Sequence, residues 1–333
     1  MRLAFLRTPR GIFAAVVLLV FALMPWIGPL VGQPYLLEIF IRIMIWSIAA
    51  ISLNLILGFG GMISFGHAAY IGIGGYTMGI LSYYEIYSGW LHWPMALLTS
   101  GLAALVFGAI CLRTRGVYFI MITLAFAQMF YFLSVSAEEY GSDDGLPLDQ
   151  RSEFALGGGQ FDISDNHIFY YVAFAFMLLS LFVTYKIVNS RFGMVVRGAK
   201  SNEPRMQAVG FPTYRYKLAC FVLSGMGCGL AGVLEANFEM YVSPDMLFWT
   251  RSGELIFMVV LGGMGSLFGP VAGTAVYLLL SEFLSEMPGL KEHWHLVFGP
   301  FLVLVVLFAR KGIDGLFEMR PQRRAAAEGA TGD

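Results

Sequence analysis

The amino-acid sequence predicts an all-α polytopic membrane protein with about eight to ten transmembrane helices and glycine-rich segments that are broken or re-entrant. Three observations support this fold class: 58% of the 333 residues are hydrophobic, 13% are charged, and the mean hydropathy is +0.71. A soluble domain has about 25% charged residues, so this chain has too few to cover a water-facing surface. The apolar content excludes a disordered chain, and the net charge of −1 excludes electrostatic capture of nucleic acid as the main activity.

A helix that crosses a bilayer needs about 20 apolar residues, and the sequence contains a series of such segments. They are residues 11–31, 36–57, 62–83, 93–112, 117–135, 168–188, 216–238, 253–264, 267–284 and 294–309. Segment 253–264 is too short to cross alone, so we expect it to be re-entrant or broken. The first segment follows Arg2, Arg7 and Arg10, as in a signal peptide. No small-residue cleavage site comes after it, so we expect an uncleaved first helix.

The distribution of basic residues predicts the topology. If every segment crosses and the N-terminus is cytoplasmic, 17 of the 21 Lys and Arg residues lie inside, and only Arg42, Arg151, Arg251 and Lys291 do not. Lys and Arg accumulate on the cytoplasmic side of a membrane, so both termini are expected there. The acidic loop 137–166 then lies outside and the basic loop 189–217 inside. We expect one transmembrane domain over residues 1–315 and a flexible cytoplasmic tail over residues 316–333.

The basic loop contains the signals of a short helix. Ser201 or Asn202 suits the N-cap, Glu203 and Pro204 suit the first turn, and Gly210 suits the C-terminal end. A helix of about two turns is marginal in water by itself and needs a surface to dock on.

Met206 and Val209 are expected to lie on one side of this helix. Two interpretations remain open. The helix either lies at the membrane interface beside anionic headgroups, or acts as a lever that fits a groove on a cytoplasmic partner.

Glycines crowd the third apolar segment, and a similar stretch occurs later in the chain. Residues 60–66 read GGMISFG and residues 262–269 read GGMGSLFG, which differ by one inserted residue. Glycines permit close helix packing, but they also occur where broken helices line a transport path. The likeness of the two stretches is equally compatible with a parallel repeat and with chance. As a hypothesis we assign to the substrate path Asn54, Gly60, Gly61, Ser64, His67, Gly262, Gly263 and Ser266.

Ionisable residues within apolar segments are candidate functional residues. We expect His67 to hydrogen-bond a carbonyl freed by the broken helix, with a position lining the path as the alternative. Glu235, Glu254 and Arg42 lie near the outer ends of their segments, where we expect them to reach water.

No metal, cofactor or nucleotide site is predicted. The three cysteines lie in apolar runs and are expected to be small buried residues rather than disulfide partners. The spacing of His293 and His295 lacks further ligands, and Trp294 is expected to anchor the membrane interface. Residues 193–201 have one residue too many before Lys200 for a phosphate-binding loop. Any ATP-driven step therefore requires a separate chain.

A set of motifs runs through most of the chain. They are residues 53–55, 58–70, 72–77, 115–119, 123–124, 191–193, 208–210, 216–218, 232, 243–244, 260–266 and 269. Together they resemble the LivM-type permeases of branched-chain amino-acid ABC transporters. The likeness covers residues from roughly 35 to 315, and its motifs are specific to that family.

The resemblance implies partners and a role for the basic loop. It implies a LivH-like second permease subunit, two cytoplasmic ATPase subunits and a periplasmic solute-binding protein, assembled in the lipid bilayer of a bacterial inner membrane. The loop would contact the ATPase, with Glu203 and Gly210 at its landmark positions. Pro204 departs from the Ala-Ala that follows Glu in the general permease motif. The implied coupling residues are Glu203, Arg205, Met206, Val209 and Gly210.

We therefore expect an ABC importer permease for leucine, isoleucine and valine, with no cofactor and no catalytic residues of its own. The branched-chain substrates come from the resemblance alone, and related systems carry urea, short amides or aromatic acids. A stand-alone secondary transporter is the rival class. It would place acidic residues deep in several spans, whereas the carboxylates here gather near span ends. A membrane-embedded enzyme is disfavoured, because no paired His, Asp or Glu set is evident.

Overall fold

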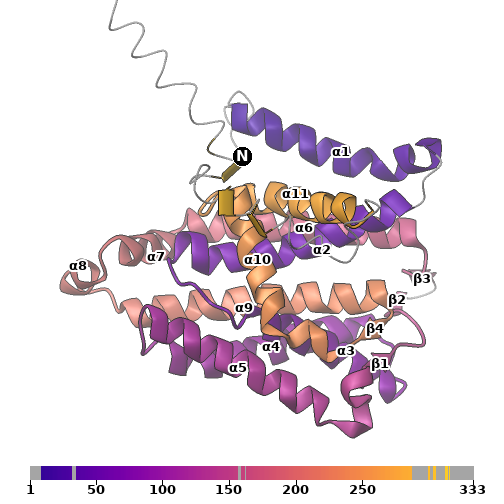
Figure 1. The fold of residues 1–333 in the computed structure, drawn as a ribbon, viewed down its shortest axis with the longest axis horizontal. Helices are drawn as coiled ribbons and strands as arrows, with labels where there is room; N and C mark the ends of the chain where they lie inside the picture. The colour runs from indigo at the N-terminus through magenta and orange to yellow at the C-terminus, as the bar shows by residue number, and fades with distance from the viewer. Residues whose placement is uncertain are drawn as a thin grey trace, which may run out of the picture.

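The apolar segments fold as long helices. The computed structural model describes residues 9–31, 35–156, 159–161 and 163–286, together with positions 299–300, 303–304, 312–313 and 315. The helices are α1 (Pro9–Val31), α2 (Tyr35–Asn54), α3 (His67–Tyr83), α4 (Gly89–Cys111), α5 (Val117–Val135), α6 (Asn166–Val188), α7 (Arg191–Ser201), α8 (Glu203–Ala208), α9 (Thr213–Glu239), α10 (Trp249–Gly262) and α11 (Gly269–Glu286) (Figure 1).

The predicted all-α polytopic fold is confirmed. Within the described residues, five helical stretches are long and apolar enough to cross a membrane: α2 with its extension, α4, α5, α6 and α9. Residues 11–26 of α1 and 269–285 of α11 form shorter apolar helices. Most of the predicted last segment, 294–309, and the predicted tail, 316–333, lie outside the described residues, as do Lys291 and His293–His295. The total number of crossings stays a prediction.

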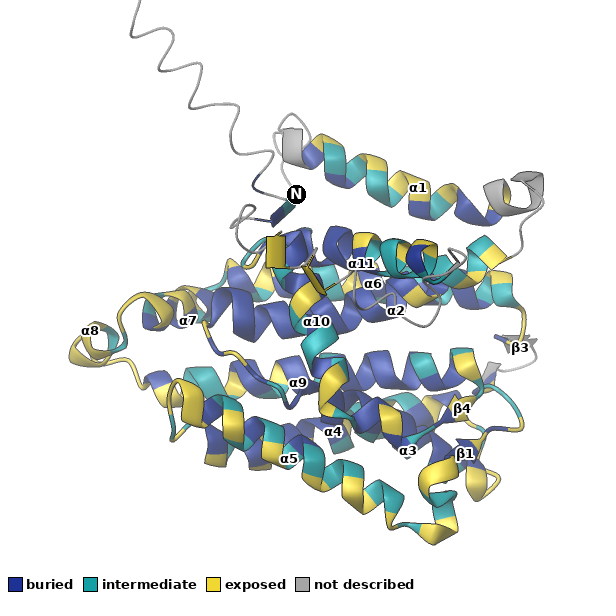
Figure 2. Ribbon diagram, in the orientation of Figure 1, coloured by how far each residue is buried: buried dark blue, intermediate teal, exposed yellow. Residues whose placement is uncertain are grey.

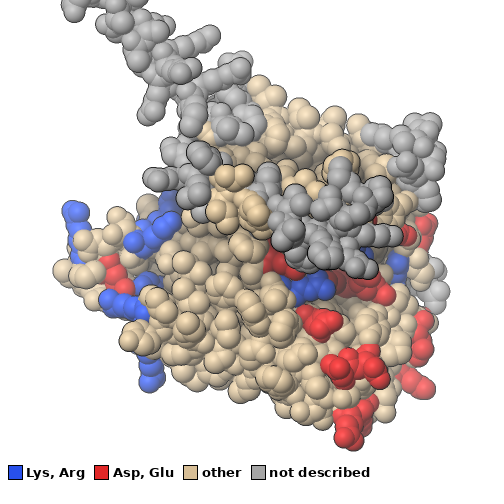
Figure 3. Space-filling model, viewed as in Figure 1, with Lys and Arg blue, Asp and Glu red and all other residues tan. Residues whose placement is uncertain are grey.

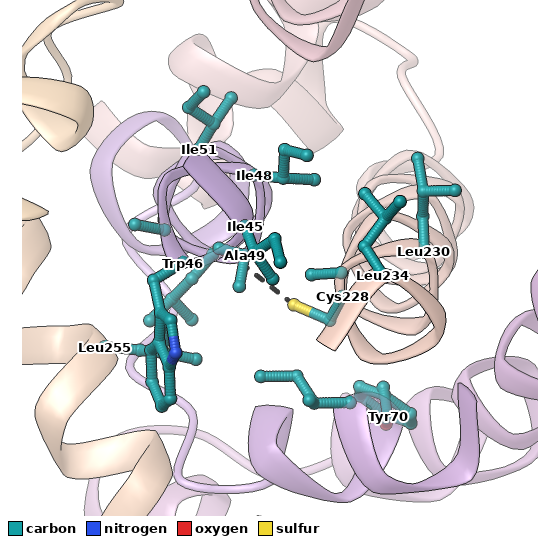
Figure 4. Close-up of a cluster of buried hydrophobic side chains, with 14 of the residues drawn as sticks. Ile45, Trp46, Ile48, Ala49, Ile51, Tyr70, Cys228, Leu230, Leu234 and Leu255 are labelled. Atoms are coloured by element: carbon teal, nitrogen blue, oxygen red, sulfur yellow. Dashed lines mark hydrogen bonds between the residues drawn. The ribbon is translucent and has the colours of Figure 1, made fainter. Parts of the chain in front are cut away.

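Helices α2 and α9 form the centre of the bundle. Their most apolar stretches are 83% and 61% buried, against 22% for α5 and 28% for α6 (Figure 2). In the core between them, Ile45 and Ala49 of α2 face Cys228 and Leu234 of α9 (Figure 4). The outer helices present apolar side chains outward, such as Tyr118, which is 76% exposed. This is the pattern of a helix that faces lipid or another subunit.

Glycines let α3 and α9 approach each other backbone to backbone. A Cβ atom on Gly74 would lie 2.1 Å from the carbonyl oxygen of Gly229, and one on Gly232 would lie 1.9 Å from that of Ile71. These contacts support the interpretation of close packing for the glycines of α3.

The chain is broken at both glycine-rich stretches, as expected. Helix α2 continues into a π-helix (Leu55–Phe59), and the backbone is then non-helical until α3 begins at His67. Helix α10 ends at Gly262, and residues 263–268 are irregular before α11 begins. At each break, backbone groups lack helical partners and are free to bond elsewhere.

The end of the bundle that carries the 137–166 loop contains short strands that the sequence analysis did not predict. Strand β1 (Leu146–Pro147) pairs antiparallel with β4 (Tyr241–Val242), and β2 (Phe154–Leu156) pairs antiparallel with β3 (Gly159–Phe161). Helices of 3₁₀ type cover Glu138–Tyr140, Ser142–Asp144 and Pro244–Leu247.

Charges are separated between the two ends of the bundle. Lys and Arg side chains gather around α7 and α8, whereas Asp and Glu side chains gather toward the end with the short strands (Figure 3). A cytoplasmic end is expected to be the basic one. The arrangement agrees with the predicted topology, in which the loop with α7 and α8 faces the cytosol.

Candidate functional site

The basic loop folds as two helices, of which the sequence analysis predicted one. Helix α7 was missed, and its cap is the Ser190 hydroxyl, which accepts the N–H of Gly193 at 3.3 Å. Helix α8 begins as predicted, with Asn202 as its cap: the Asn202 side chain accepts the N–H of Arg205 at 3.0 Å. The alternative cap, Ser201, is instead the last residue of α7.

Glu203 is clamped inward rather than presented to solvent. Its carboxylate accepts a charged hydrogen bond from Lys217 Nζ at 2.8 Å and a hydrogen bond from the Thr213 hydroxyl at 3.1 Å, and lies 3.4 Å from the Arg115 guanidinium. Partial burial raises the pKa of this carboxyl, but Lys217, Thr213 and Arg115 outweigh burial and hold the pKa below its usual value. Glu203 therefore fastens α8 to the start of α9 and to the α4–α5 turn.

The other predicted coupling residues divide into an inner and an outer group. Met206 packs against Gly198 of α7, where an added Cβ would lie 2.8 Å from the methionine sulfur. Val209 is 67% exposed, and Arg205 and Gly210 are also exposed. Of the predicted coupling residues, Arg205, Val209 and Gly210 are thus the ones on the surface.

Replacing Gly210 with Ala is expected to weaken this turn. Gly210 has φ +95°, which a residue with a side chain adopts at a cost of about 1–2 kcal/mol, and nothing within 4 Å would obstruct the added methyl group. In the reconstituted transporter, we expect substrate-stimulated ATP hydrolysis to fall several-fold while membrane insertion stays normal. Unchanged stimulation of ATP hydrolysis in Gly210→Ala would contradict a role for this turn.

Asn54, at the end of α2, joins the segment before the first glycine-rich stretch to the second stretch. Its side-chain N–H donates to the carbonyl of Ser266 at 2.7 Å, and its side-chain oxygen accepts the backbone N–H of Gly265 at 3.0 Å. Asn54 is 1% exposed. Gly58 lies against the same contact, because a Cβ there would be 2.4 Å from the Gly265 nitrogen. The second glycine-rich stretch therefore meets the end of α2 and the π-helix, just before the first stretch, and the Asn54 side chain satisfies backbone groups that the second break sets free.

Lys200 ties helix α7 to the first of these stretches. Its Nζ donates to the carbonyl of Gly58 at 2.6 Å. Its aliphatic stem runs past Gly61, where an added Cβ would lie 2.8 Å from the Lys200 Cγ. Gly61 also has φ +70°, so both its backbone conformation and the space beside it favour glycine. The sequence analysis missed Lys200 as a functional residue.

A cavity connects the contact of Lys200 with Gly58 to the ion pairs of Glu203. It has a volume of about 350 Å³, and its lining includes Gly61, Arg115, Lys200, Glu203 and Lys217. The first glycine-rich stretch and the α7–α8 helices therefore face one another across a cavity with both charged and apolar walls, at the basic end of the molecule.

His67 and Ser64 form a separate buried network. The ring nitrogens of His67 lie 3.0 Å from the hydroxyls of Ser64 and Ser224. Because the Ser224 hydroxyl donates to the carbonyl of Ser52 at 2.5 Å, its oxygen accepts from His67 Nε2–H, and the Ser64 hydroxyl donates to Nδ1. The expected carbonyl partner of His67 is therefore wrong: the serine hydroxyls satisfy a fully buried ring.

The remaining candidate path residues shape the two breaks. Gly60 follows the π-helix, and a Cβ on it would lie 2.7 Å from the carbonyl oxygen of Ile56. Gly262 approaches the backbone of Gly269 so closely that a Cβ would lie 1.9 Å from its oxygen. Gly263 has φ +112° where α10 ends, and the Ser266 hydroxyl accepts the N–H of Gly269 at 3.0 Å. Their assignment to a substrate path stays a prediction.

The described part of the chain contains no cluster of three or more His, Cys, Asp or Glu side chains arranged to hold a metal ion. Cys111, Cys220 and Cys228 are free and buried, as predicted. Cys220 and Cys228 direct their sulfurs to the carbonyls of Leu55 and Ala49, at 3.7 and 3.8 Å. Both pack α9 against α2 and its extension, and Figure 4 shows Cys228 facing Ala49.

Comparison with known proteins identifies the family. Residues 35–307 match the family described as branched-chain amino acid transport system / permease component. The chain is 30% identical over 310 residues to the high-affinity branched-chain amino acid transport system permease protein LivM of Salmonella typhimurium and to that of Escherichia coli, covering 87% of this chain and 72% of each relative. It is 26% identical over 220 residues to the L-arabinose ABC transporter permease protein AraH of Azospirillum brasilense, covering 63% of this chain and 61% of that relative. No solved structure matches significantly.

The comparisons confirm the resemblance that the sequence motifs predicted, and the apolar helices agree with it. The relative from Azospirillum brasilense is named for a sugar, so the family as a whole is wider than amino-acid permeases. The chain belongs to the permease family of branched-chain amino acid transport systems and is a multi-pass membrane protein.

Proposed function

We propose that this chain is the transmembrane subunit of a binding-protein-dependent ABC importer that carries leucine, isoleucine and valine across a bacterial inner membrane. The observation that supports this most strongly is the 30% identity to two LivM permeases over 87% of the chain. A second permease subunit would complete the path, two ATPase subunits would supply the energy, and a periplasmic binding protein would deliver the substrate. The chain itself forms no covalent bond with substrate.

The contacts of the basic loop support a route for the energy. The exposed side chains of Arg205 and Val209 on α8 would contact an ATPase subunit. The Glu203 clamp makes α8 move with the start of α9, and the contact of Met206 with Gly198 makes it move with α7. Such a contiguous set of packed and hydrogen-bonded groups is a physical means of coupling distant sites.

When an ATPase subunit displaces α8, α7 would move with it, and Lys200 would pass this displacement from α7 to the membrane-embedded helices. Lys200 holds the carbonyl of Gly58 within the π-helix, and Asn54, just before the π-helix, bonds to residues 265 and 266. A pull on Lys200 would therefore act on both glycine-rich breaks together. We propose that these breaks are where the domain changes shape when access switches from one side of the membrane to the other.

Transport by the reconstituted complex tests this function. The chain is assembled in liposomes with its second permease subunit and both ATPase subunits, and the loaded binding protein is supplied at the outer face. We expect uptake of labelled leucine that requires ATP and is competed by isoleucine and valine. Competition by L-arabinose, urea, short amides or aromatic acids, without competition by valine, would assign another substrate class. Uptake that persists without ATP or the ATPase subunits would contradict the importer.

A further inference from the structure

The structure contains a second cavity, at the opposite end of the bundle from the basic loop, residues 189–217. Its volume is about 530 Å³, within the range of about 300–1,000 Å³ that small-molecule sites occupy. Its walls come from α2, α9, α10 and α11, so it lies between the central helices and the helix pair that flanks the second glycine-rich break. For three of its charged residues, Arg42, Glu235 and Glu254, the sequence analysis expected only that they reach water.

Five charged side chains line this cavity, and both signs are represented. Arg42 and Arg251 supply two guanidinium groups, and Glu235, Glu239 and Glu254 supply three carboxylates. Arg42 and Glu239 form a close pair, with Nη2 and Oε1 2.8 Å apart, and both side chains are more than 40% exposed. This pair forms the solvent-exposed part of the site.

The deeper pair is arranged differently. Arg251 Nη1 and Glu235 Oε1 are 4.0 Å apart, well beyond the roughly 2.7–2.9 Å of a charge-assisted hydrogen bond. The Glu235 side chain is only 14% exposed. The expectation that Glu235 extends into water is therefore wrong. The guanidinium of Arg251 lies over the ring of Trp46, with its carbon 5.2 Å from the ring centroid, which fixes its orientation.

The remaining lining is largely apolar. Met246, Met258 and Leu278 border the same space as the charged groups. Methionine side chains adapt to hydrocarbon groups of different shape. The cavity thus combines a positive group, a negative group and an apolar wall within one small volume.

We infer that this cavity is an entry subsite for a zwitterionic α-amino acid with an apolar side chain. The substrate carboxylate would bind the Arg251 guanidinium, its ammonium would bind the Glu235 carboxylate, and its side chain would contact Met258 and Leu278. A ligand of this kind would bridge the two charges that stand 4.0 Å apart and give each a close partner. A neutral sugar would leave both partly desolvated charges unmatched, which opposes its binding.

This inference rests on the proposed function, because it names where the transported amino acid first meets the permease. It also assigns the discrimination between amino acids and neutral solutes to this chain and not only to a binding protein. Arg251 and Glu235 are then specificity residues, and neither belongs to the basic loop.

Ligand binding to the assembled transporter in nanodiscs, without binding protein, tests the subsite. Ligand-observed NMR compares leucine with leucinol, which lacks the carboxylate, and with 4-methylpentanoate, which lacks the ammonium. The wild-type complex is expected to bind leucine at least tenfold more tightly than either analogue. Arg251→Met should remove the preference over leucinol, and Glu235→Gln should remove the preference over 4-methylpentanoate. Arg113→Met and Glu138→Gln are the matched controls, because both residues are exposed away from the cavity.

The loss of a different ligand preference in each variant distinguishes direct contact with the ligand from a structural role of Arg251 and Glu235. Misfolding would weaken all three ligands together, whereas a direct contact removes one preference in each variant. If the wild-type complex transports leucine but each variant keeps both preferences or loses both together, the subsite is contradicted and the proposed function stands. If the wild-type complex transports no amino acid, both proposals fail.

Discussion

Asn54→Leu is expected to abolish transport and to destabilise the protein by about 2–5 kcal/mol. The substitution keeps the size of the side chain but removes the hydrogen bonds to Gly265 N–H and Ser266 C=O, which bridge the two broken segments. Each buried backbone group left without a partner costs about 1–3 kcal/mol. Within the part of the chain that the structure describes, no other side-chain hydrogen bond joins the two breaks, so a displacement of the first would no longer be passed to the second.

Two measurements check this expectation: the unfolding midpoint of the purified complex and ATP-dependent uptake. Asn189→Leu is the matched control, because Asn189 is an exposed residue at the end of α6. Asn54→Asp adds a second comparison, since it keeps the acceptor for Gly265 N–H and loses the donor to Ser266. Asn54→Leu with an unchanged unfolding midpoint and normal uptake would contradict the proposed link between the breaks.

Lys200→Met is expected to uncouple ATP hydrolysis from transport without preventing assembly. The variant keeps much of the apolar stem that packs on Gly61 but loses the charged hydrogen bond to the Gly58 carbonyl. Hydrogen bonds to charged groups contribute about 1.5–3 kcal/mol. If this contact passes the movement of α7 to the first glycine-rich break, the ratio of molecules transported to ATP hydrolysed should fall about 10–100-fold. That factor is the free energy of the lost hydrogen bond expressed as an equilibrium ratio.

The measurement compares uptake with ATP hydrolysis in the same proteoliposomes. Lys186→Met controls for loss of a basic residue at the same end of the molecule, because Lys186 lies at the exposed end of α6. Lys200→Arg should restore part of the coupling, since it keeps a charged donor near the carbonyl. Equal coupling ratios in Lys200→Met and the wild-type protein would remove Lys200 from the proposed route.

The apolar helices could be predicted because their signal is local. Residues 117–135 were predicted as a span and are α5 to the residue. The cap at Asn202 could likewise be predicted, since a cap depends on neighbours within three residues. Helix α7 was missed because Gly193 and Gly198 lower its helix propensity, although Ser190 before it is a suitable cap.

The contacts of the candidate site could not be predicted, because they join residues far apart in the chain. Asn54 and Ser266 are separated by 212 positions, and Lys200 and Gly58 by 142. Nothing near Lys200 indicates which carbonyl it reaches. His67 was singled out correctly as a buried polar residue, but its partner Ser224 is 157 positions away. The sequence therefore indicated the residues that needed partners, while the packing of α2, α7 and α9 determined the partners.

The π-helix at Leu55–Phe59 has a consequence for how this segment tolerates insertions and deletions. A π turn accommodates one residue more than an α turn. Removing a single residue there would allow a regular α-helix and leave the residues beyond it in their present phase relative to Asn54. Removing one residue from the regular α-helix before it would instead rotate everything beyond by about 100°. A one-residue deletion should therefore be tolerated better within this wide turn than within α2.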